Sequence, residues 1–309
     1  MCKSGIQNSK YFNKDYKNSV CIGDWVVGEI KDDQYIINRR LDRKTRISRK
    51  ATGNEVKEQV LASNIDKVFI IQSLNNDFNI RRMERYLISA WDSGAEPIIV
   101  LTKLDCCDNS EAKIAEVEQI AFGVKVIAIS TLKNINMERL IEAIGIYDTV
   151  VMLGSSGVGK TTLFNFLVGK KILETKEIRK KDDKGKHTTT HRQMMLISNG
   201  GIIIDTPGMR SLEIWDGGTG VKETFKDVEE LIRECKFNNC THKNEPGCKI
   251  QESLKNGRID RKRWDSYLKI VREMNYQKER KKAKIEKINK KSNYNKKNKR
   301  KKFEYCKKY

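Results

Sequence analysis

The segment Gly154–Thr161 constrains the fold of this chain more than any other part of the sequence. It matches the pattern Gly-x4-Gly-Lys-Thr, in which the glycines let the backbone turn so that several N–H groups point inward. An apolar, β-branched run over residues 149–153 precedes it, and a run with helical spacing over residues 162–168 follows it. A strand, a loop and a helix in this order form a phosphate-binding site, because the helix N-terminus also attracts anions. The sequence therefore predicts an α/β fold that binds a nucleotide.

The loop and the first turn of the following helix supply the predicted phosphate and metal contacts. Lys160 would reach the β- and γ-phosphates, and the Thr161 hydroxyl would hold Mg²⁺, so both are predicted catalytic residues. A chance match by a loop that contains glycine and lysine is the alternative, and the flanking strand and helix argue against it. The residues expected to contact the nucleotide here are Gly154, Ser155, Ser156, Gly157, Val158, Gly159, Lys160, Thr161 and Thr162.

A second segment, residues 102–105, indicates which base the nucleotide carries. It follows an apolar run over residues 97–101 that predicts a buried parallel strand, and its sequence Thr-Lys-Leu-Asp is close to the Asn-Lys-x-Asp pattern of GTPases. The Asp105 carboxylate would accept hydrogen bonds from N1–H and the amine of guanine, which adenine cannot satisfy, while the Lys103 stem could cover the base. Alone, a charged turn after a strand explains the segment equally well; beside a phosphate loop it favours guanine. The expected base-binding residues are Thr102, Lys103, Leu104, Asp105, Ser130 and Thr131.

A predicted hairpin, formed by residues 193–197 and 201–204, leads into Asp205-Thr-Pro-Gly208. Asp205 would hold Mg²⁺ through water, and the N–H of Gly208 would sense the γ-phosphate. One of three neighbouring threonines, residues 188–190, should also meet Mg²⁺ when GTP is bound, and the sequence does not choose among them. With Thr189 standing for that group, the predicted magnesium residues are Thr161, Thr189 and Asp205.

The order of these segments is unusual. In the conventional GTPase order the phosphate loop comes first, whereas here residues 102–105 and 130–131 precede Gly154. The same sheet forms if the usual chain ends are joined and the chain is opened elsewhere, because the termini of compact domains often lie close together. A helix predicted over residues 137–144, followed directly by the strand at Thr149, would make that join. The sequence therefore predicts a circularly permuted GTPase domain.

A cluster of potential metal ligands lies further along the chain. Cys235, Cys240, His242 and Cys248 have the spacing Cys-x4-Cys-x-His-x5-Cys. Three thiolates and one imidazole fill a tetrahedral Zn²⁺ site and leave no position for water, which predicts a structural metal that stabilises a module too small to bury much apolar surface. Disulfides are one alternative, which the polar start of the sequence argues against. A nucleophile and base formed by Cys240 and His242 is another, and the spacing favours a shared metal.

Taken together, the permuted order and residues 154–162, 185–190, 205–210 and 235–248 resemble the bacterial ribosome small-subunit-dependent GTPase A family, over about residues 20 to 275. The resemblance implies an oligonucleotide-binding (OB) β-barrel, a permuted P-loop GTPase domain and a C-terminal helical zinc-binding domain. It also implies a cytoplasmic enzyme that binds the small (30S) ribosomal subunit and its rRNA. Such an enzyme would hydrolyse GTP late in maturation of that subunit and act as an assembly checkpoint.

The resemblance places the domains as follows. We expect an OB-like β domain over residues 1–64, the GTPase domain over 65–215, the zinc-binding domain over 216–275 and a disordered basic tail over 276–309. An OB barrel has five strands, yet clear strand patterns before the GTPase domain cover only residues 20–30 and 34–38. The barrel is therefore expected to be truncated or rebuilt, with strand edges that need a cover.

The residue that orients the attacking water for GTP hydrolysis is not marked by a known motif in this sequence. Many GTPases orient the attacking water with a Gln directly after Asp-x-x-Gly; here that position is Met209, so intrinsic hydrolysis should be slow. His187 is the candidate for positioning the water instead, and the alternative is that His187 and His191 are exposed or contact RNA. Thr102 occupies a position where Asn is commonest, which should weaken or alter the tie between the base segment and the phosphate loop.

Charge supports a nucleic-acid partner. The formal net charge is +21, and residues 278–309 hold 16 Lys or Arg against 3 Asp or Glu. Such a tail would release counterions on binding phosphates, although general drift towards Lys, Asn and Ile also explains it. The expected ligands are GTP or GDP with Mg²⁺; a membrane partner is not expected, and the chain should be a monomer. The alternative function is a GTP-regulated RNA-binding module with incidental hydrolysis, while an ATP-driven RNA remodeller conflicts with Asp105.

Overall fold

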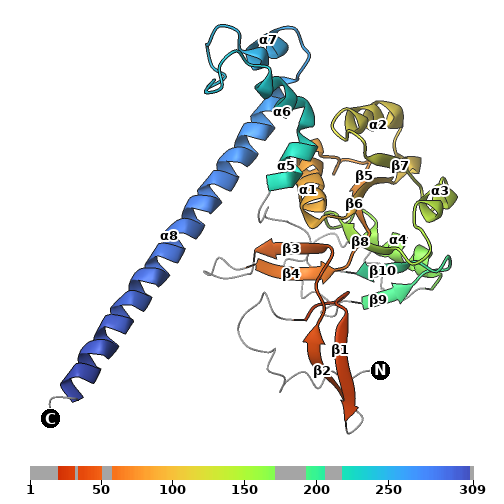
Figure 1. Ribbon diagram of the computed structural model, residues 1–309. Coiled ribbons are helices and arrows are strands. Elements are labelled where there is room, and N and C mark those ends of the chain that lie inside the picture. Colours follow the sequence, from red (N-terminus) through yellow and green to blue (C-terminus); the bar gives the residue numbers. More distant parts are fainter. Residues whose placement is uncertain (1–19, 32–33, 51–57, 171–192, 206–217, 307–309) are drawn as a thin grey trace, which may run out of the picture. The chain divides into compact units, whose positions relative to one another are not determined.

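The computed structural model describes residues 20–31, 34–50, 58–170, 193–205 and 218–306 (Figure 1). The chain divides into two compact units, residues 1–229 and 230–309. The first unit contains both the N-terminal β hairpins and the GTPase-like sheet. The second contains the cysteine cluster and the long C-terminal helix. The domain boundaries expected from the sequence stay predictions.

A six-stranded sheet forms the centre of the first unit, with strand order β7-β6-β5-β8-β10-β9. All neighbouring strands are parallel except in the β9–β10 hairpin. Because a parallel sheet is covered on both faces, its central strands are almost continuously apolar. The strands are β5 (Lys67–Ser73), β6 (Glu96–Thr102), β7 (Lys125–Ala128), β8 (Thr149–Leu153), β9 (Gln193–Leu196) and β10 (Ile202–Asp205).

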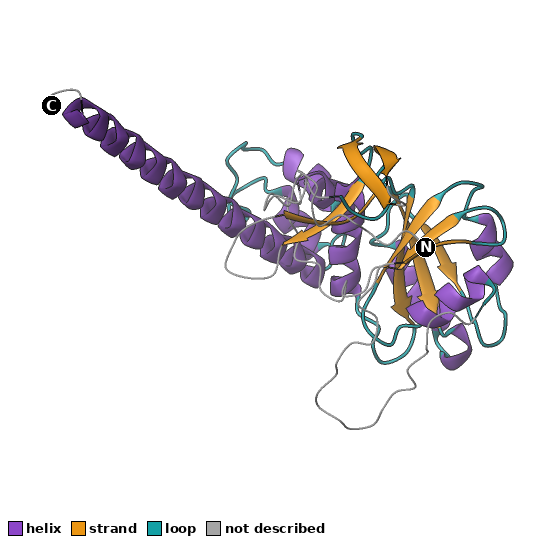
Figure 2. Ribbon diagram, turned by 90° about the horizontal axis from the view of Figure 1, so that it is seen from below, coloured by secondary structure: helices purple, strands orange, loops and turns teal. Residues whose placement is uncertain are grey.

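Helices cover both faces of this sheet (Figure 2, helices purple and strands orange). Helices α1 (Ile80–Ser93) and α2 (Ser110–Glu118) contribute to the core on one face, and α3 (Met137–Glu142) and α4 (Lys160–Val168) to the core on the other. Successive strand residues enter opposite cores, as Ile70 and Ile71 do. The predicted α/β class and the strands at the phosphate and base segments are confirmed.

The junction that permutes the domain lies between α3 and β8. Lys67, at the start of β5, donates from Nζ to the backbone oxygen of Ala143 (2.9 Å) and to Oδ2 of Asp148 (2.6 Å). The N–H of Thr149, the first residue of β8, donates to Oδ2 of Asp66 (2.8 Å). These bonds join β5, the first strand of the sheet along the chain, to β8, the strand that precedes the phosphate loop. The permuted order expected from the sequence is therefore the order of the folded domain.

Four strands precede this sheet in the described part of the chain. They are β1 (Val26–Lys31), β2 (Gln34–Arg40), β3 (Arg46–Lys50) and β4 (Glu58–Ser63). They pair as two separate antiparallel hairpins, β1–β2 and β3–β4 (Figure 1). The sequence pattern does not predict β3, because its only apolar residue is Ile47. Ile47 is 1% exposed and packs beside residues of helix α1 in the core. A closed five-stranded barrel is not formed by the residues that the structure describes.

A buried ion pair joins the residues just before β1 to the connection between β2 and β3. Asp24, whose side chain is fully buried, accepts hydrogen bonds from Arg43 Nε to Oδ1 (2.6 Å) and from Arg43 Nη2 to Oδ2 (2.7 Å). Ser63 Oγ and the N–H of Cys21 also donate to this carboxylate, at 2.6 and 2.7 Å. Burial is the largest influence on Asp24 and raises its pKa, but the hydrogen bonds from Arg43, Ser63 and Cys21 outweigh it and leave the pKa below its ordinary value.

Helix α5 (Gly218–Thr224) packs against α1 at very short range. The N–H of Gly220 donates to Oδ1 of Asp92 (2.7 Å). A Cβ at Gly220 would lie 2.2 Å from the backbone oxygen of Ile88, so only glycine fits this contact. Helix α5, the first described element after β10, thus lies against the first helix of the domain.

The second unit is helical. Helix α6 (Lys226–Arg233) spans the boundary between the units, and α7 (Lys249–Lys255) and α8 (Arg261–Cys306) follow. Because α8 continues to Cys306, residues 276–306 are helical, where the sequence analysis expected disorder. The physical reason is that residues 261–306 contain no Gly or Pro and are rich in Lys, Arg and Glu, which favour helix. None of the helices in the described residues combines the length and the apolar composition needed to cross a bilayer.

Candidate nucleotide and metal sites

The phosphate loop connects β8 to α4 at the carboxyl end of the sheet, where open α/β sheets bind their ligands. Gly154 has to be glycine, because a Cβ there would lie 2.4 Å from the backbone oxygen of Ile71 on the neighbouring strand. Helix α4 begins at Lys160. Lys160 Nζ donates to the backbone oxygens of Gly154 (2.9 Å) and Ser155, so its ammonium group lies over the loop.

The remaining residues of the predicted loop are placed as a phosphate loop needs them. Ser156 and Gly157 are exposed at the tip, whereas Val158 is fully buried in the core below α4. Thr161 and Thr162 lie in the first turn of α4 and are partly exposed. Val158 thus anchors the loop in the core, while the tip stays accessible beside the positive end of helix α4.

The segment predicted to bind the base contacts the phosphate loop directly. Thr102, the last residue of β6, donates from Oγ1 to the backbone oxygen of Val158 (2.6 Å). Its neighbour Lys103 donates from Nζ to the backbone oxygen of Gly157 (2.9 Å). Two segments that lie more than fifty positions apart in the chain therefore form one surface.

The predicted guanine-binding carboxylate lies between two chain segments. Asp105 is in a short 3-10 helix (Leu104–Cys106), and the N–H of Leu104 donates to the backbone oxygen of Ile129, directly after β7 (3.1 Å). A hydrogen bond from Ser130 is the largest influence on Asp105 and lowers the pKa of its carboxyl; the thiol of Cys106 adds a second bond (3.3 Å). Asp105 is therefore ionised at neutral pH, as hydrogen bonding to guanine requires. Thr131 follows Ser130 in the adjoining turn.

Asp205 is the last residue of β10, which is the parallel neighbour of β8. Burial raises the pKa of its carboxyl, and the positive charge of Lys160 lowers it in part. A hydroxyl on Thr161 and a carboxylate on Asp205 are oxygen donors of the kind that Mg²⁺ binds. The donor set on these two neighbouring elements thus fits the ion. His187, Thr188, Thr189, Thr190, Gly208 and Met209 lie outside the described residues.

One contact of the phosphate loop has no counterpart in the sequence analysis. Ser155 Oγ donates to Oδ2 of Asp77 (2.7 Å), which lies in the loop between β5 and α1. The two residues are 78 positions apart, and no motif marks Asp77. Only the position of that loop at the carboxyl end of β5 could have drawn attention to it.

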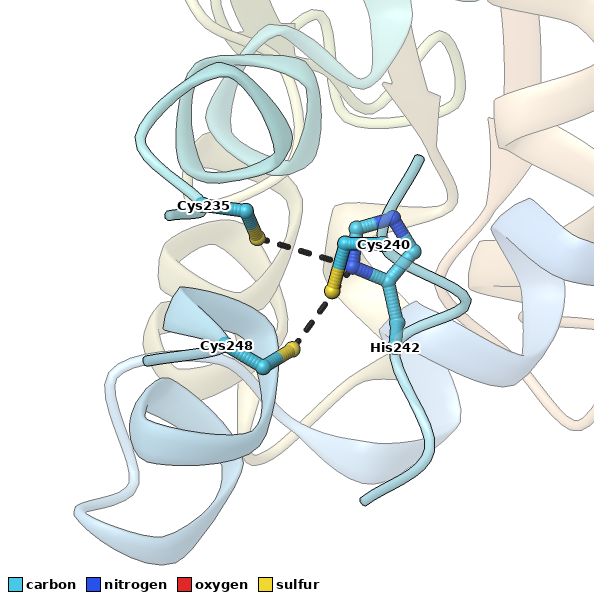
Figure 3. Close-up of side chains that lie close together, drawn as sticks. All are labelled: Cys235, Cys240, His242 and Cys248. Atoms are coloured by element: carbon cyan, nitrogen blue, oxygen red, sulfur yellow. Dashed lines mark hydrogen bonds between the residues drawn. The ribbon is translucent and has the colours of Figure 1, made fainter. Parts of the chain in front are cut away.

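The four residues of the predicted metal site come together in the second unit (Figure 3). Their ligand atoms all lie within 4.8 Å of one another, and Nδ1 of His242 is 3.6 Å from Sγ of both Cys235 and Cys248. Tetrahedral Zn²⁺ with bonds of about 2.1 to 2.3 Å would separate its ligand atoms by roughly 3.5 to 3.8 Å. The residues therefore fit a Zn²⁺ ion, with Cys240 as the fourth ligand.

Neighbouring side chains fix the orientation of these ligands. Trp264 of α8 makes an edge contact with the His242 ring, at 5.5 Å between ring centroids, and Gln251 of α7 donates to the His242 backbone oxygen (2.6 Å). Glu245 folds the loop by accepting the Thr241 hydroxyl and N–H, together with the N–H groups of Lys243 and Asn244. These bonds, led by that of the Thr241 hydroxyl, lower the pKa of Glu245 to about 2. The loop is thus shaped by its own polar groups as well as by the ligands.

Family models and curated relatives match most of the chain. A family model described as RsgA GTPase matches residues 40–215. A second model, described as 50S ribosome-binding GTPase, matches residues 149–303. It begins at β8 and does not include the two segments expected to bind the base, residues 102–105 and 130–131. The small ribosomal subunit biogenesis GTPase RsgA 1 of Listeria innocua is 44% identical over 271 residues, covering 88% of this chain and 77% of that protein. RsgA of Methanosarcina acetivorans is 39% identical over 266 residues, covering 85% and 72%.

Two solved structures are similar in fold. YjeQ from Thermotoga maritima has a TM-score of 0.61 and 25% sequence identity, over 83% of this chain and 84% of that one. YloQ, whose structure is described as a circularly permuted GTPase, has a TM-score of 0.59 and 23% identity, over 87% and 85%. The second match is a likeness of fold alone.

Proposed function

Because the chain belongs to the RsgA GTPase family, we propose that it binds the small ribosomal subunit and hydrolyses GTP during late maturation of that subunit. The names of relatives that are 39–44% identical over most of this chain support the proposal. The observation that carries it is the contact between the base segment and the phosphate loop through Thr102 and Val158. That contact joins the segment that carries Asp105, which we expect to select guanine, to the loop that we expect to hold the triphosphate.

We assign the nucleotide contacts as follows. The N–H groups of the phosphate loop and Lys160 would bind the β- and γ-phosphates, and Lys160 would stabilise the charge that develops as the terminal phosphate leaves. Asp105 would accept from guanine, with Ser130 holding the carboxylate in place. Thr161, Asp205 and one of the threonines 188–190 would hold Mg²⁺. The ion would neutralise charge on the phosphate oxygens.

We assign a structural Zn²⁺ to Cys235, Cys240, His242 and Cys248, whose donor set completes a tetrahedron and leaves no position for water. The excess positive charge near the C-terminus supports contact with rRNA. Ribosomal subunits mature in the cytoplasm, so we place the enzyme there, as a monomer that acts as an assembly checkpoint. His187 remains our candidate for orienting the attacking water.

Stimulated turnover tests the proposal. Phosphate release from GTP is measured with and without purified small subunits, with ATP as the competing nucleotide and Lys160→Ala as the inactive control. We expect stimulation on the order of tenfold or more, in line with partner-activated GTPases, and no turnover of ATP. GTP-dependent subunit binding without stimulation would instead establish the RNA-binding module, because Met209 in place of Gln is compatible with both functions. Equal use of ATP and GTP would contradict both.

A further inference from the structure

The phosphate loop is supported from outside by side chains of two earlier segments. The base segment supplies two of these bonds, from Thr102 to Val158 and from Lys103 to Gly157. The third joins Ser155 Oγ to Oδ2 of Asp77 (2.7 Å). Asp77 lies in the loop between β5 and α1, so this bond comes from a different segment than the other two.

Asp77 is itself held firmly. Its N–H donates to Oδ1 of Asn75 (3.1 Å), and its backbone oxygen accepts from Nε2 of Gln72 (2.7 Å), a residue that is 1% exposed. Arg82 donates from Nη2 to the same Asp77 oxygen that Ser155 contacts (2.8 Å) and to the Asp77 backbone oxygen. The Arg82 N–H is in turn capped by Asn79 at the start of α1 (2.9 Å). The Asp77 side chain is 42% exposed, and these bonds hold its carboxylate in one position.

The charge of Asp77 is compensated at this place. A bare carboxylate beside a triphosphate would weaken nucleotide binding, because like charges repel. The Arg82 guanidinium is bonded to it, and Lys103 adds a second positive charge close by. Burial raises the pKa of Asp77, but Ser155, Arg82 and Lys103 outweigh it and leave the pKa below its ordinary value. Asp77 thus acts as an ionised acceptor, which makes a stronger hydrogen bond than a neutral one.

The geometry points to Asp77 as a positioning residue that holds the phosphate loop in its nucleotide-binding shape through Ser155. This inference rests on the proposed GTPase function. A phosphate loop binds through several N–H groups that have to face the same ligand, so a loose loop loses conformational entropy when the nucleotide binds. Asp77 orders the second residue of the loop before GTP arrives. Its effect is on nucleotide affinity more than on the chemical step.

The test compares Asp77→Ala, Ser155→Ala and the double variant in the full-length protein. Titration with a fluorescent GTP analogue in the presence of Mg²⁺ gives Kd, and GTP turnover with small subunits gives KM and kcat. Each single variant should raise Kd and KM about tenfold, the range of a charge-assisted hydrogen bond. We expect kcat to stay within about twofold, since the lost interaction acts equally on the ground and transition states. The double variant should be no weaker than either single variant, because both remove the same bond.

Two further variants separate positioning from stability. Asp77→Asn keeps an acceptor for Ser155 and should bind GTP within about threefold of the wild type. Asp148→Ala removes an aspartate that accepts from Lys67 and the N–H of Gly145 at the permuted junction. It should lower the Tm without changing Kd for GTP.

The results separate the role of Asp77 from the proposed GTPase function. Additive losses in the double variant, unchanged Kd in Ser155→Ala, or a fall in kcat with unchanged KM would overturn the role of Asp77. A wild-type protein that bound no GTP would contradict the proposed function instead, whatever the variants did.

Discussion

The hydroxyl of Thr102 donates a 2.6 Å hydrogen bond to the backbone oxygen of Val158, 56 residues further along the chain. Most GTPases have Asn where this chain has Thr102, and the sequence suggested a weakened or altered tie at this point. In the structure, one hydroxyl makes the tie and the Lys103 ammonium adds a second bond, to Gly157. Thr102 is 3% exposed, so water cannot replace its bond.

Thr102→Val tests the strength of this tie, because valine keeps the shape and removes the hydroxyl. The buried oxygen of Val158 would lose its side-chain donor, which should lower the free energy of unfolding by about 1 to 2 kcal/mol and raise Kd for GTP several-fold. Urea denaturation and nucleotide titration measure the two effects. Thr149→Val is the matched control: it removes a buried threonine hydroxyl at the start of β8, away from the phosphate loop, and should leave Kd unchanged. Equal effects of the two substitutions on Kd would contradict the assignment.

The contact between α5 and α1 depends on glycine at position 220. Gly220→Ala would place a Cβ 2.2 Å from the Ile88 backbone oxygen and 2.9 Å from Oδ1 of Asp92. Backbone cannot yield as a flexible side chain does, so we expect the free energy of unfolding to fall by about 1 to 3 kcal/mol. Gly218→Ala in the same helix meets nothing within 4 Å and should be neutral or slightly stabilising. Thermal unfolding gives the Tm of each variant. Equal Tm values for Gly220→Ala and Gly218→Ala would contradict the close contact between α5 and α1.

The Asp24–Arg43 pair predicts a dependence of stability on pH. The folded pKa of Asp24 is below its unfolded value, so the carboxylate contributes stability that is fully present above the unfolded pKa, about 3.9, and is lost as pH falls through the folded value. Asp24→Asn leaves Arg43 buried without its counter-charge and should cost about 3 kcal/mol at pH 7. The difference between wild type and variant should shrink below about pH 4. Urea denaturation across this range measures it, and a constant difference would refute the pairing.

Removal of zinc should unfold the metal loop without abolishing the nucleotide site. We expect one zinc per chain by atomic absorption, and a loss of more than about 100-fold in zinc affinity in Cys248→Ser, because the remaining thiolates and imidazole no longer complete the tetrahedron. Cys107→Ser, a half-buried cysteine outside the cluster, should retain the metal. Nucleotide titration of the chelated protein checks the independence of the GTP site. Retention of zinc by Cys248→Ser would exclude the proposed ligand set.

Local patterns were sufficient for most elements of the sheet and for the four residues that gather at the candidate metal site. The apolar runs at residues 97–101 and 149–153 are strands, and the cysteine and histidine spacing brings four ligand atoms together. These features depend on neighbouring residues, so short-range rules apply to them. Strand β3 is different, because its burial comes from packing beside α1 and its charged residues hide the pattern. The basic tail was also misjudged, since its charge suggested disorder while its helix propensity extends α8 to Cys306.

What the sequence by itself determined is the set of chemical parts and their unusual order: a phosphate loop, a guanine-type segment placed before it, and a metal-ligand cluster. Each of these features is a motif of residues that lie close together along the chain. Only the tertiary structure decided which parts touch, as in the bonds of Thr102 to Val158 and of Asp77 to Ser155, across 56 and 78 positions. Such contacts follow from the order in which strands lie side by side, because parallel strands bring their carboxyl ends to one edge whatever their separation in sequence.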